Sequence, residues 1–129
     1  MATPSQQAIN TVLAADAQLT ALIASRLYQV EAPQGALMPL LVMHVLTTQP
    51  ATSHGEGADA RLDEVTVTLT ALALTPLAAA NIIYRVRQVL EASATLKGEL
   101  MDERQLDRSD DANCHGRAAD FRVWNNPDA

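Results

Sequence analysis

The chain has 129 residues, of which 48% are hydrophobic and only 3% are aromatic. This length and composition indicate one folded domain with an aliphatic core, and they exclude a disordered chain. The net charge of −6 argues against general nucleic-acid binding by the isolated chain, because such binding requires a basic surface.

The first predicted element is a helix at residues 4–24. Thr3 can cap its N-terminus, and Pro4 suits the first helical position because no hydrogen bond is lost there. Apolar residues follow at helical spacing on both sides of Asp16. This aspartate either lies within one long helix or caps a short second helix.

Two strands and a long loop are predicted next. Residues 27–30 and 40–48 are rich in aliphatic and β-branched residues, as is typical of strands, and the prolines and glycine between them indicate a turn. Residues 49–62 contain a proline, two glycines and several small polar residues, so they are predicted to form a flexible loop.

Residues 64–74 show the clearest strand pattern in the chain. One predicted face is apolar and consists of Val65, Val67, Leu69, Ala71 and Ala73. The other face consists of Thr66, Thr68, Thr70, Leu72 and Leu74. Because this second face changes from polar to apolar along its length, its far end is covered either by loops of the same domain or by a second subunit.

The C-terminal half predicts a second helix and two further strands. Thr75 and Pro76 repeat the combination of a cap and a first-turn proline, and the helix ends near residues 92–94. The remaining predicted segments are a strand at 95–101, a hairpin or flexible loop at 102–113, a strand at 114–124 and a frayed tail at 125–129.

Together these elements predict one α+β domain over residues 1–129. Turns rather than helical crossovers join most of the strands, so the sheet should be mainly antiparallel, with two principal helices packed against it. No apolar run reaches the roughly 18 residues that a membrane helix needs. The first residues also lack the pattern of a signal peptide, so we expect a soluble protein without a membrane partner.

The sequence contains no pattern typical of a catalytic, metal or cofactor site. The candidate metal ligands are His44, His54, Cys114 and His115, but no pair has the spacing of a zinc site. No serine lies in a GxSxG motif, and no catalytic motif surrounds the single cysteine. That cysteine excludes an internal disulfide and fits a reducing cytoplasm. We therefore predict no catalytic residue, no metal, no cofactor and no enzymatic activity.

The stretch from Asp16 to Pro39 carries a more specific pattern. It has the form D-x-x-L-x-x-L-(I/V)-x-x-R-(I/L)-Y, followed by a P-Q-G-A turn and a further proline. The matching residues are Asp16, Leu19, Leu22, Ile23, Arg26, Leu27, Tyr28, Pro33, Gln34, Gly35, Ala36 and Pro39. In these residues the chain resembles the bacteriophage tail completion, or tail terminator, proteins. Leu40 departs from the family pattern, in which an aromatic residue is common at this point.

The resemblance implies a structural role at the head–tail junction of a long-tailed phage or prophage. Tail terminators resemble one another in forming a ring, commonly of six subunits, on the end of the tail tube. The ring stops tube polymerisation and provides a surface for head joining. The implied partners are other copies of the chain, the tail tube protein and a head-completion or connector protein, and DNA passes through the lumen without sequence-specific binding. The implied location is the head-proximal end of the virion tail, after synthesis in the host cytoplasm.

Three sets of residues are candidate contacts under this interpretation. The first lies in the long loop, is predicted to meet the tail tube or another partner, and consists of Ser53, His54, Glu56, Asp59 and Arg61. The second lies in the charged segment, is assigned to another face of the ring, and consists of Asp102, Glu103, Arg104, Asp107 and Arg108. The third is a predicted subunit interface and consists of Leu72, Leu74 and Trp124.

Three alternative functions remain open from the sequence. The nearest is another head–tail connector component, such as a head-closure or adaptor protein, which would bind the portal rather than the tail tube. A remote one is a small metal- or ligand-binding enzyme that uses His44 or His115. A third, a regulatory or toxin–antitoxin module, lacks the basic recognition helix that it would need.

Overall fold

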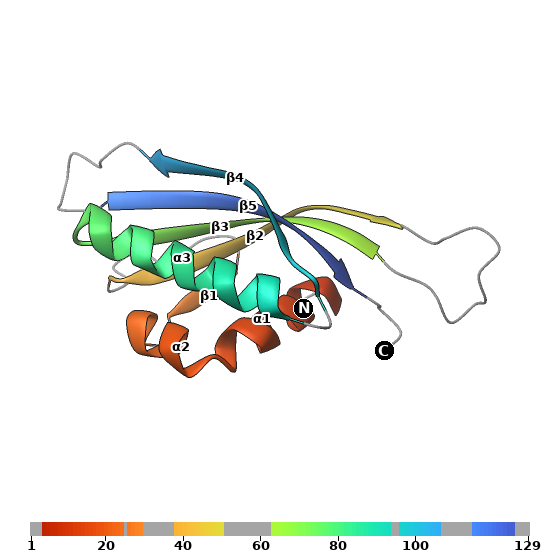
Figure 1. Ribbon diagram of the computed structural model, residues 1–129, viewed down its shortest axis with the longest axis horizontal. Helices are drawn as coiled ribbons and strands as arrows, with labels where there is room; N and C mark the ends of the chain where they lie inside the picture. The colour runs from red at the N-terminus through yellow and green to blue at the C-terminus, as the bar shows by residue number, and fades with distance from the viewer. Residues whose placement is uncertain are drawn as a thin grey trace.

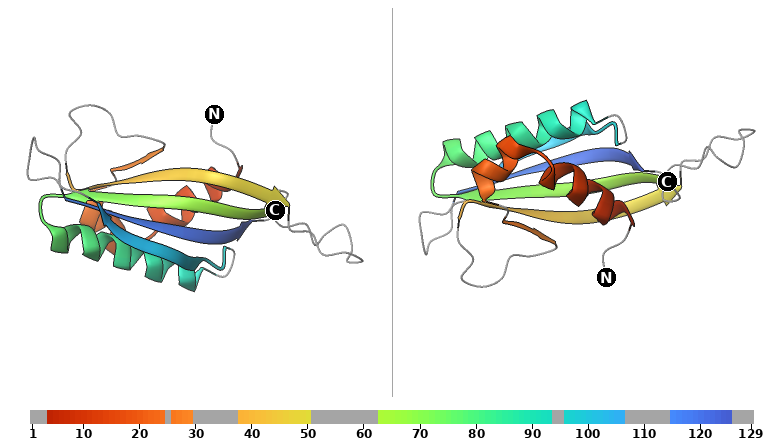
Figure 2. Two further views of the ribbon diagram at one scale, coloured as in Figure 1. Left: turned by 90° about the horizontal axis from the view of Figure 1, so that it is seen from above. Right: turned by 90° about the horizontal axis from the view of Figure 1, so that it is seen from below.

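The computed structural model describes residues 4–24, 26–29, 38–50, 63–93, 96–106 and 115–125 of the chain. The elements in chain order are α1 (Pro4–Ala14), α2 (Ala17–Ile23), β1 (Leu27–Gln29), β2 (Leu40–Pro50), β3 (Asp63–Ala73), α3 (Pro76–Ala92), β4 (Glu99–Leu106) and β5 (His115–Asn125). They form a five-stranded sheet with the helices on one side (Figures 1 and 2). The predicted α+β class is therefore confirmed.

The predicted first helix is divided in two at Asp16. The backbone of Asp16 is extended, with φ −83° and ψ 115°, and the Asp16 carboxylate accepts a hydrogen bond of 2.8 Å from the Leu19 N–H. An aspartate with this geometry caps a helix and stabilises one of the N–H groups that the first turn leaves unpaired. Of the two roles considered for Asp16, the cap of a short second helix is confirmed.

The long helix α3 follows its sequence signals closely. The Thr75 hydroxyl accepts a hydrogen bond of 3.1 Å from the Ala78 N–H, and Pro76 occupies the first turn. A stripe at helical spacing packs on the sheet and is fully buried: Ala79, Ile82, Ile83, Val86 and Leu90. The helix is therefore specified both by its cap and by its apolar face.

The strands lie in the order β1-β2-β3-β5-β4. The short β1 pairs in parallel with β2, and the other three pairs are antiparallel. The sheet is mainly antiparallel, as predicted, with β1 and β4 at its two edges. In chain direction β1, β2 and β5 run one way, while β3 and β4 run the other way.

The core lies between the sheet and the helices. Every residue on the predicted apolar face of β3 has an exposed fraction of 0%. One cross-strand row of this core runs from Val45 through Val67 and Phe121 to Leu100. Side chains alternate between the two faces of a strand, so these rows also define a second face that no helix covers. We call this second surface the open face.

Two β-bulges interrupt the sheet. The register shifts at Leu46 in the pairing of β2 with β3, and at Met101 in the pairing of β4 with β5. Both side chains are about half exposed, at 50% and 47%. A bulge bends its strand and increases the local twist, in agreement with the curved path of β4 in Figure 1.

The segment after α3 was predicted correctly only in part. The hairpin considered for residues 102–113 agrees with the antiparallel pairing of β4 with β5, whereas the strand boundaries differ. The strand expected at 95–101 is β4 at Glu99–Leu106, so residues 102–106 are part of the sheet and not of a loop. Their charged side chains are accommodated because β4 is an edge strand with partly exposed residues on both faces. The rest of the predicted loop at 102–113 lies outside the described residues.

The strands β2 and β5 end later in the chain than predicted. Gln49 and Pro50 are the last residues of β2, and the remainder of the predicted loop, 51–62, lies outside the described residues. Asn125 ends β5, and the predicted frayed tail beyond it is likewise outside them. Within the described part of the chain, no helix is both long enough and apolar enough to span a membrane.

Candidate assembly surface

The open face carries a chain of polar contacts across three strands. The Thr68 hydroxyl of β3 donates a hydrogen bond of 2.7 Å to Asp120 of β5. The other oxygen of Asp120 accepts a hydrogen bond of 3.2 Å from Arg104 of β4, and the same Arg104 nitrogen lies 3.3 Å from Asp102. Side chains from β3, β5 and β4 thus hold this side of the sheet together.

A second charged group lies further along the same face. Arg122 of β5 lies 3.0 Å from the Glu64 carboxylate of β3, although its buried Nε is not aligned for a hydrogen bond. Its guanidinium carbon is 6.0 Å from the centre of the Trp124 ring, within the range of a cation–π contact. Both arginines on the described open face are therefore neutralised within the chain.

The edge strand β4 is also held on the side that faces the helices. Glu103 of β4 forms an ion pair with Arg117 of β5. Because Asp102 and Arg104 alternate with Glu103, β4 has charged contacts on both of its faces. This arrangement explains how a strand with the sequence ELMDERQL lies at a sheet edge.

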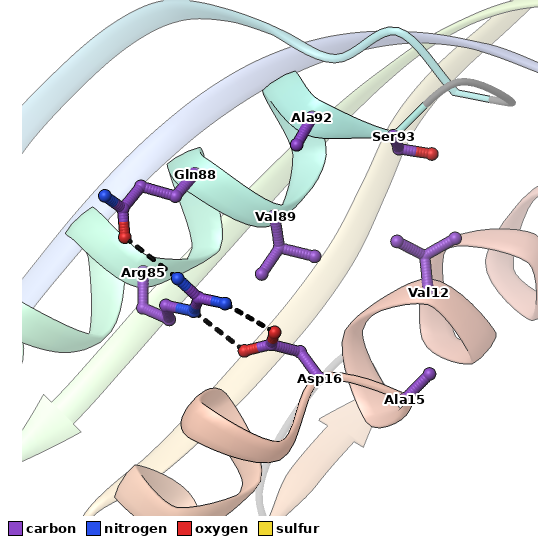
Figure 3. Close-up of a pocket in the computed structure, with 8 residues that line it drawn as sticks. All are labelled: Val12, Ala15, Asp16, Arg85, Gln88, Val89, Ala92 and Ser93. Carbon is purple, nitrogen blue, oxygen red and sulfur yellow. Dashed lines mark hydrogen bonds and ion pairs between the residues drawn. The ribbon is translucent and has the colours of Figure 1, made fainter.

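A polar cluster joins the α1–α2 corner to α3 (Figure 3). Arg85 donates two hydrogen bonds to Asp16, of 2.8 and 2.6 Å, and a third of 3.2 Å to Gln88. The contact lines an open cleft of about 430 Å³, whose other residues are Val12, Ala15, Val89, Ala92 and Ser93. The bidentate geometry fixes the position of α2 relative to α3.

The Asp16–Arg85 contact shifts the protonation of both groups. The hydrogen bonds from Arg85, together with that from the Leu19 N–H, hold the pKa of the Asp16 carboxyl below its usual value. The same contact raises the pKa of Arg85. Asp16 therefore stays ionised at neutral pH, where it acts both as a helix cap and as an ion-pair partner.

The residues of the sequence pattern at Asp16–Pro39 have structural positions. Leu19 and Ile23 are buried in the core, and Asp16 caps α2. The Arg26 Nε donates a hydrogen bond of 2.9 Å to the Pro39 carbonyl, while the Arg26 carbonyl accepts one of 2.9 Å from the Leu41 N–H. Arg26 thus aligns the start of β1 with β2, so the described residues of the pattern have structural roles. Pro33, Gln34, Gly35 and Ala36 of the pattern lie outside the described residues.

The structure separates the candidate contact residues. The first set, Ser53, His54, Glu56, Asp59 and Arg61, lies outside the described residues, as do Asp107 and Arg108 of the second set. The other three residues of the second set lie on β4, where Arg104 already pairs within the chain. All of these contacts stay predictions.

The predicted interface residues do not form one patch. Leu72 lies opposite Gly116 and Trp124 opposite Glu64, so the two are at opposite ends of β3, roughly 26 Å apart at a strand rise of about 3.3 Å per residue. Leu72 is half-buried near Leu40 and Gly116 of its own chain, whereas Leu74 is 55% exposed.

Several residues of this surface were missed from sequence. Asp120 and Arg122 alternate along β5, but their partners Thr68, Arg104 and Glu64 follow from strand order, which alternation does not give. Arg85 lies 69 residues from Asp16 along the chain, and no local signal connects them.

The described histidines do not form a metal site. His44 is exposed on β2, although it lies in an apolar stretch of sequence, and His115 is half-buried on β5. No group of three or more possible metal ligands occurs among the described residues.

Comparison with known proteins identifies the family. Residues 7–124 match the family model described as "Tail completion protein gp17". The chain belongs to this family. No curated protein sequence matches it. Membership over most of the chain supports a structural role in a phage tail.

Two solved structures share the fold. The gp17 protein of bacteriophage SPP1 is 13% identical, with a TM-score of 0.55, over 94% of this tail completion chain and 88% of the other. A chain of the virion of a native gene transfer agent particle is 19% identical, with a TM-score of 0.54, over 90% of each chain. At these identities the likeness shows the fold alone.

Proposed function

We propose that this protein is a tail terminator. Copies of the chain form a ring of six subunits, as the resemblance to tail terminators implies, on the head-proximal end of the tail tube. The ring stops tube polymerisation and provides the surface to which the head connector binds. The observation that carries this proposal is the family match over residues 7–124.

The geometry of the subunit supports a ring. A closed ring needs two different surfaces on each subunit, because the contact is head-to-tail. The sheet separates two such surfaces, a helical layer and an open face, and it has two unlike edges, β1 and β4. A single domain with this asymmetry can repeat around an axis without a second protein.

The candidate contacts fit different partners under this proposal. Residues 53–61 meet the tail tube, and the charged segment that includes Asp107 and Arg108 meets another ring partner. Both segments adjoin strands of one sheet, so a ring would bring six copies of each together. DNA passes through the lumen, and the pairing of Arg104 and Arg122 within the chain leaves these two guanidinium groups less available to phosphate.

The first experiment measures assembly and capping together. Light scattering over a range of concentrations gives the molar mass, first for the protein alone and then with purified tail tubes. Growing tubes imaged by electron microscopy should stop elongating when the protein is added. Binding to a portal complex with no effect on tube length would overturn the terminator role in favour of a head-closure or adaptor protein.

A sequence change then tests the tube-contact segment. Scrambling residues 53–61 should leave the circular dichroism spectrum and the unfolding midpoint unchanged, because the core lies in the helices and sheet, but it should abolish capping. Capping at the normal level by the scrambled protein would remove this segment from the proposed contact.

A further inference from the structure

The two edges of the sheet differ in the charged residues that they carry. The edge strand β4 carries three carboxylates, Glu99, Asp102 and Glu103, against one guanidinium, Arg104. At the other edge, Arg26 precedes β1, and its guanidinium contacts the Pro39 carbonyl rather than a carboxylate. One edge is acidic and the other carries a cation, and Figure 2 shows them on opposite sides of the molecule.

Strand direction favours contact between these edges. Because β1 and β5 run in one direction and β4 in the other, a neighbouring copy placed beside β1 in the same orientation presents its β4 antiparallel to it. Antiparallel ladders are the more stable kind. The same placement repeated around an axis gives every β1 a β4 partner, which reduces the number of free edges.

The edge residue Gln29 supplies a second, independent observation. Its amide oxygen is buried and has no hydrogen-bond partner. The register places Gln29 in one row with Met43, Leu69, Ala119 and Glu103. In a sheet that continues without stagger, Gln29 of one copy is therefore level with Glu103 of the next, on the same face.

We propose that β1 of one copy pairs with β4 of the next, so that the sheets join into a continuous ring. In this contact the Gln29 amide meets the neighbouring Glu103–Arg117 ion pair: its NH₂ donates to the carboxylate, and its oxygen accepts from the guanidinium. The carboxylates of β4 repel those of a second β4, which disfavours a symmetric β4–β4 contact. This inference rests on the proposed ring function.

Cysteine cross-linking tests the pairing directly. In a Cys114→Ser background, Tyr28→Cys is mixed with Arg104→Cys, which lies in the same row on the open face, or with Asp102→Cys, the next position on that face. Oxidation or a short bismaleimide should give covalent dimers from either mixture. A chain with both cysteines should give a ladder of multimers. Tyr28→Cys mixed with Thr66→Cys, on the central strand β3, is the matched control and should stay uncross-linked.

A second variant tests the Gln29 contact without cross-linking. Gln29→Leu removes the unpaired oxygen, so the isolated subunit should be as stable as wild type or more stable, while self-association weakens on the order of tenfold. Gln49→Leu changes an exposed glutamine on β2, beyond the residues that pair with β1, and should change neither property. Unchanged association of Gln29→Leu would overturn the role of this residue.

The outcomes separate the two proposals. A ring that forms in solution or on tail tubes without cross-links between the β1 and β4 cysteines overturns the edge pairing and leaves the terminator function standing. Cross-links between two Arg104→Cys chains instead indicate a symmetric contact, which also overturns it. If no oligomer forms in solution or on tubes, the terminator function fails, and the edge pairing fails with it.

Discussion

The two faces of the sheet are built on different principles. The face under the helices is closed by aliphatic side chains and Phe121, most of them fully buried, and one row of this core crosses four strands. The open face is held by hydroxyl, carboxylate and guanidinium groups such as Thr68, Asp120 and Arg104, which remain partly exposed. The same strands supply both, because side chains alternate along each strand.

The two faces should contribute differently to the stability of the subunit and to its contacts with partners. Burial of apolar surface supplies most of the free energy of folding, so the covered face determines whether the subunit folds. Exposed ion pairs contribute little to stability, and their value lies in register and in the choice of partner. Substitutions on the two faces of one strand should therefore have separable effects.

The largest effect is expected on the covered face. Phe121→Ala leaves a cavity in the row that joins Val45, Val67 and Leu100, and should lower the free energy of unfolding by about 3–5 kcal/mol. Urea unfolding followed by circular dichroism measures the loss. Trp124→Ala, on the opposite face of β5, is the control and should cost clearly less; equal losses would contradict the division between the faces.

Substitution of Gly98, at the border of the covered face, should have the next largest effect on stability. A Cβ on Gly98 would lie 2.7 Å from the Leu90 Cβ and 2.9 Å from the Leu90 carbonyl oxygen, which already accepts a hydrogen bond from the Gly98 N–H. Gly98→Ala should therefore destabilise the protein by about 1–3 kcal/mol, as overpacking does. An unchanged unfolding midpoint would show that α3 and β4 can separate at no cost.

Substitution of Asp16, which pairs with Arg85 between α2 and α3, should have an intermediate effect with two separable parts. Asp16→Ala removes both the α2 cap and the ion pair, and loss of a cap alone costs about 1 kcal/mol. Asp16→Asn keeps a capping oxygen and removes only the charge, so it should cost less than Asp16→Ala. Equal losses in urea unfolding would mean that the cap contributes nothing measurable.

The Asp16–Arg85 ion pair also predicts how stability depends on pH. The pKa of Asp16 is lower in the folded than in the unfolded chain, so the pair stabilises the fold fully above the unfolded pKa. This contribution disappears as the pH falls through the lower, folded pKa. Stability measured from pH 7 to strongly acidic pH should therefore decline less steeply for Asp16→Asn than for wild type, and parallel curves would contradict the lowered pKa.

The sequence predicts what depends on local pattern and misses what depends on strand order. Alternation identified both faces of β3, and the cap and proline at Thr75–Pro76 placed α3 correctly. Composition alone left Asp102–Leu106 between a hairpin and a loop, because the charges of β4 are satisfied by Asp120 and Arg117 on another strand. The contact of Asp16 with Arg85 also depends on tertiary structure, so local sequence patterns did not predict it. Tertiary pairing, not propensity, decides these positions.

The smallest effect on stability is expected at the centre of the open face. Asp120→Asn keeps an acceptor for the Thr68 hydroxyl but removes the charge that faces Arg104, so the free energy of unfolding should change by less than about 1 kcal/mol. Arg104 keeps its ion pair with Asp102, and the open face loses one negative charge. If this face serves assembly, light scattering should register a change in self-association that urea unfolding does not. Thr70→Ser, on the same face but outside the ion-pair chain, is the control. A stability loss as large as that of Phe121→Ala would instead make the open face part of the folding core.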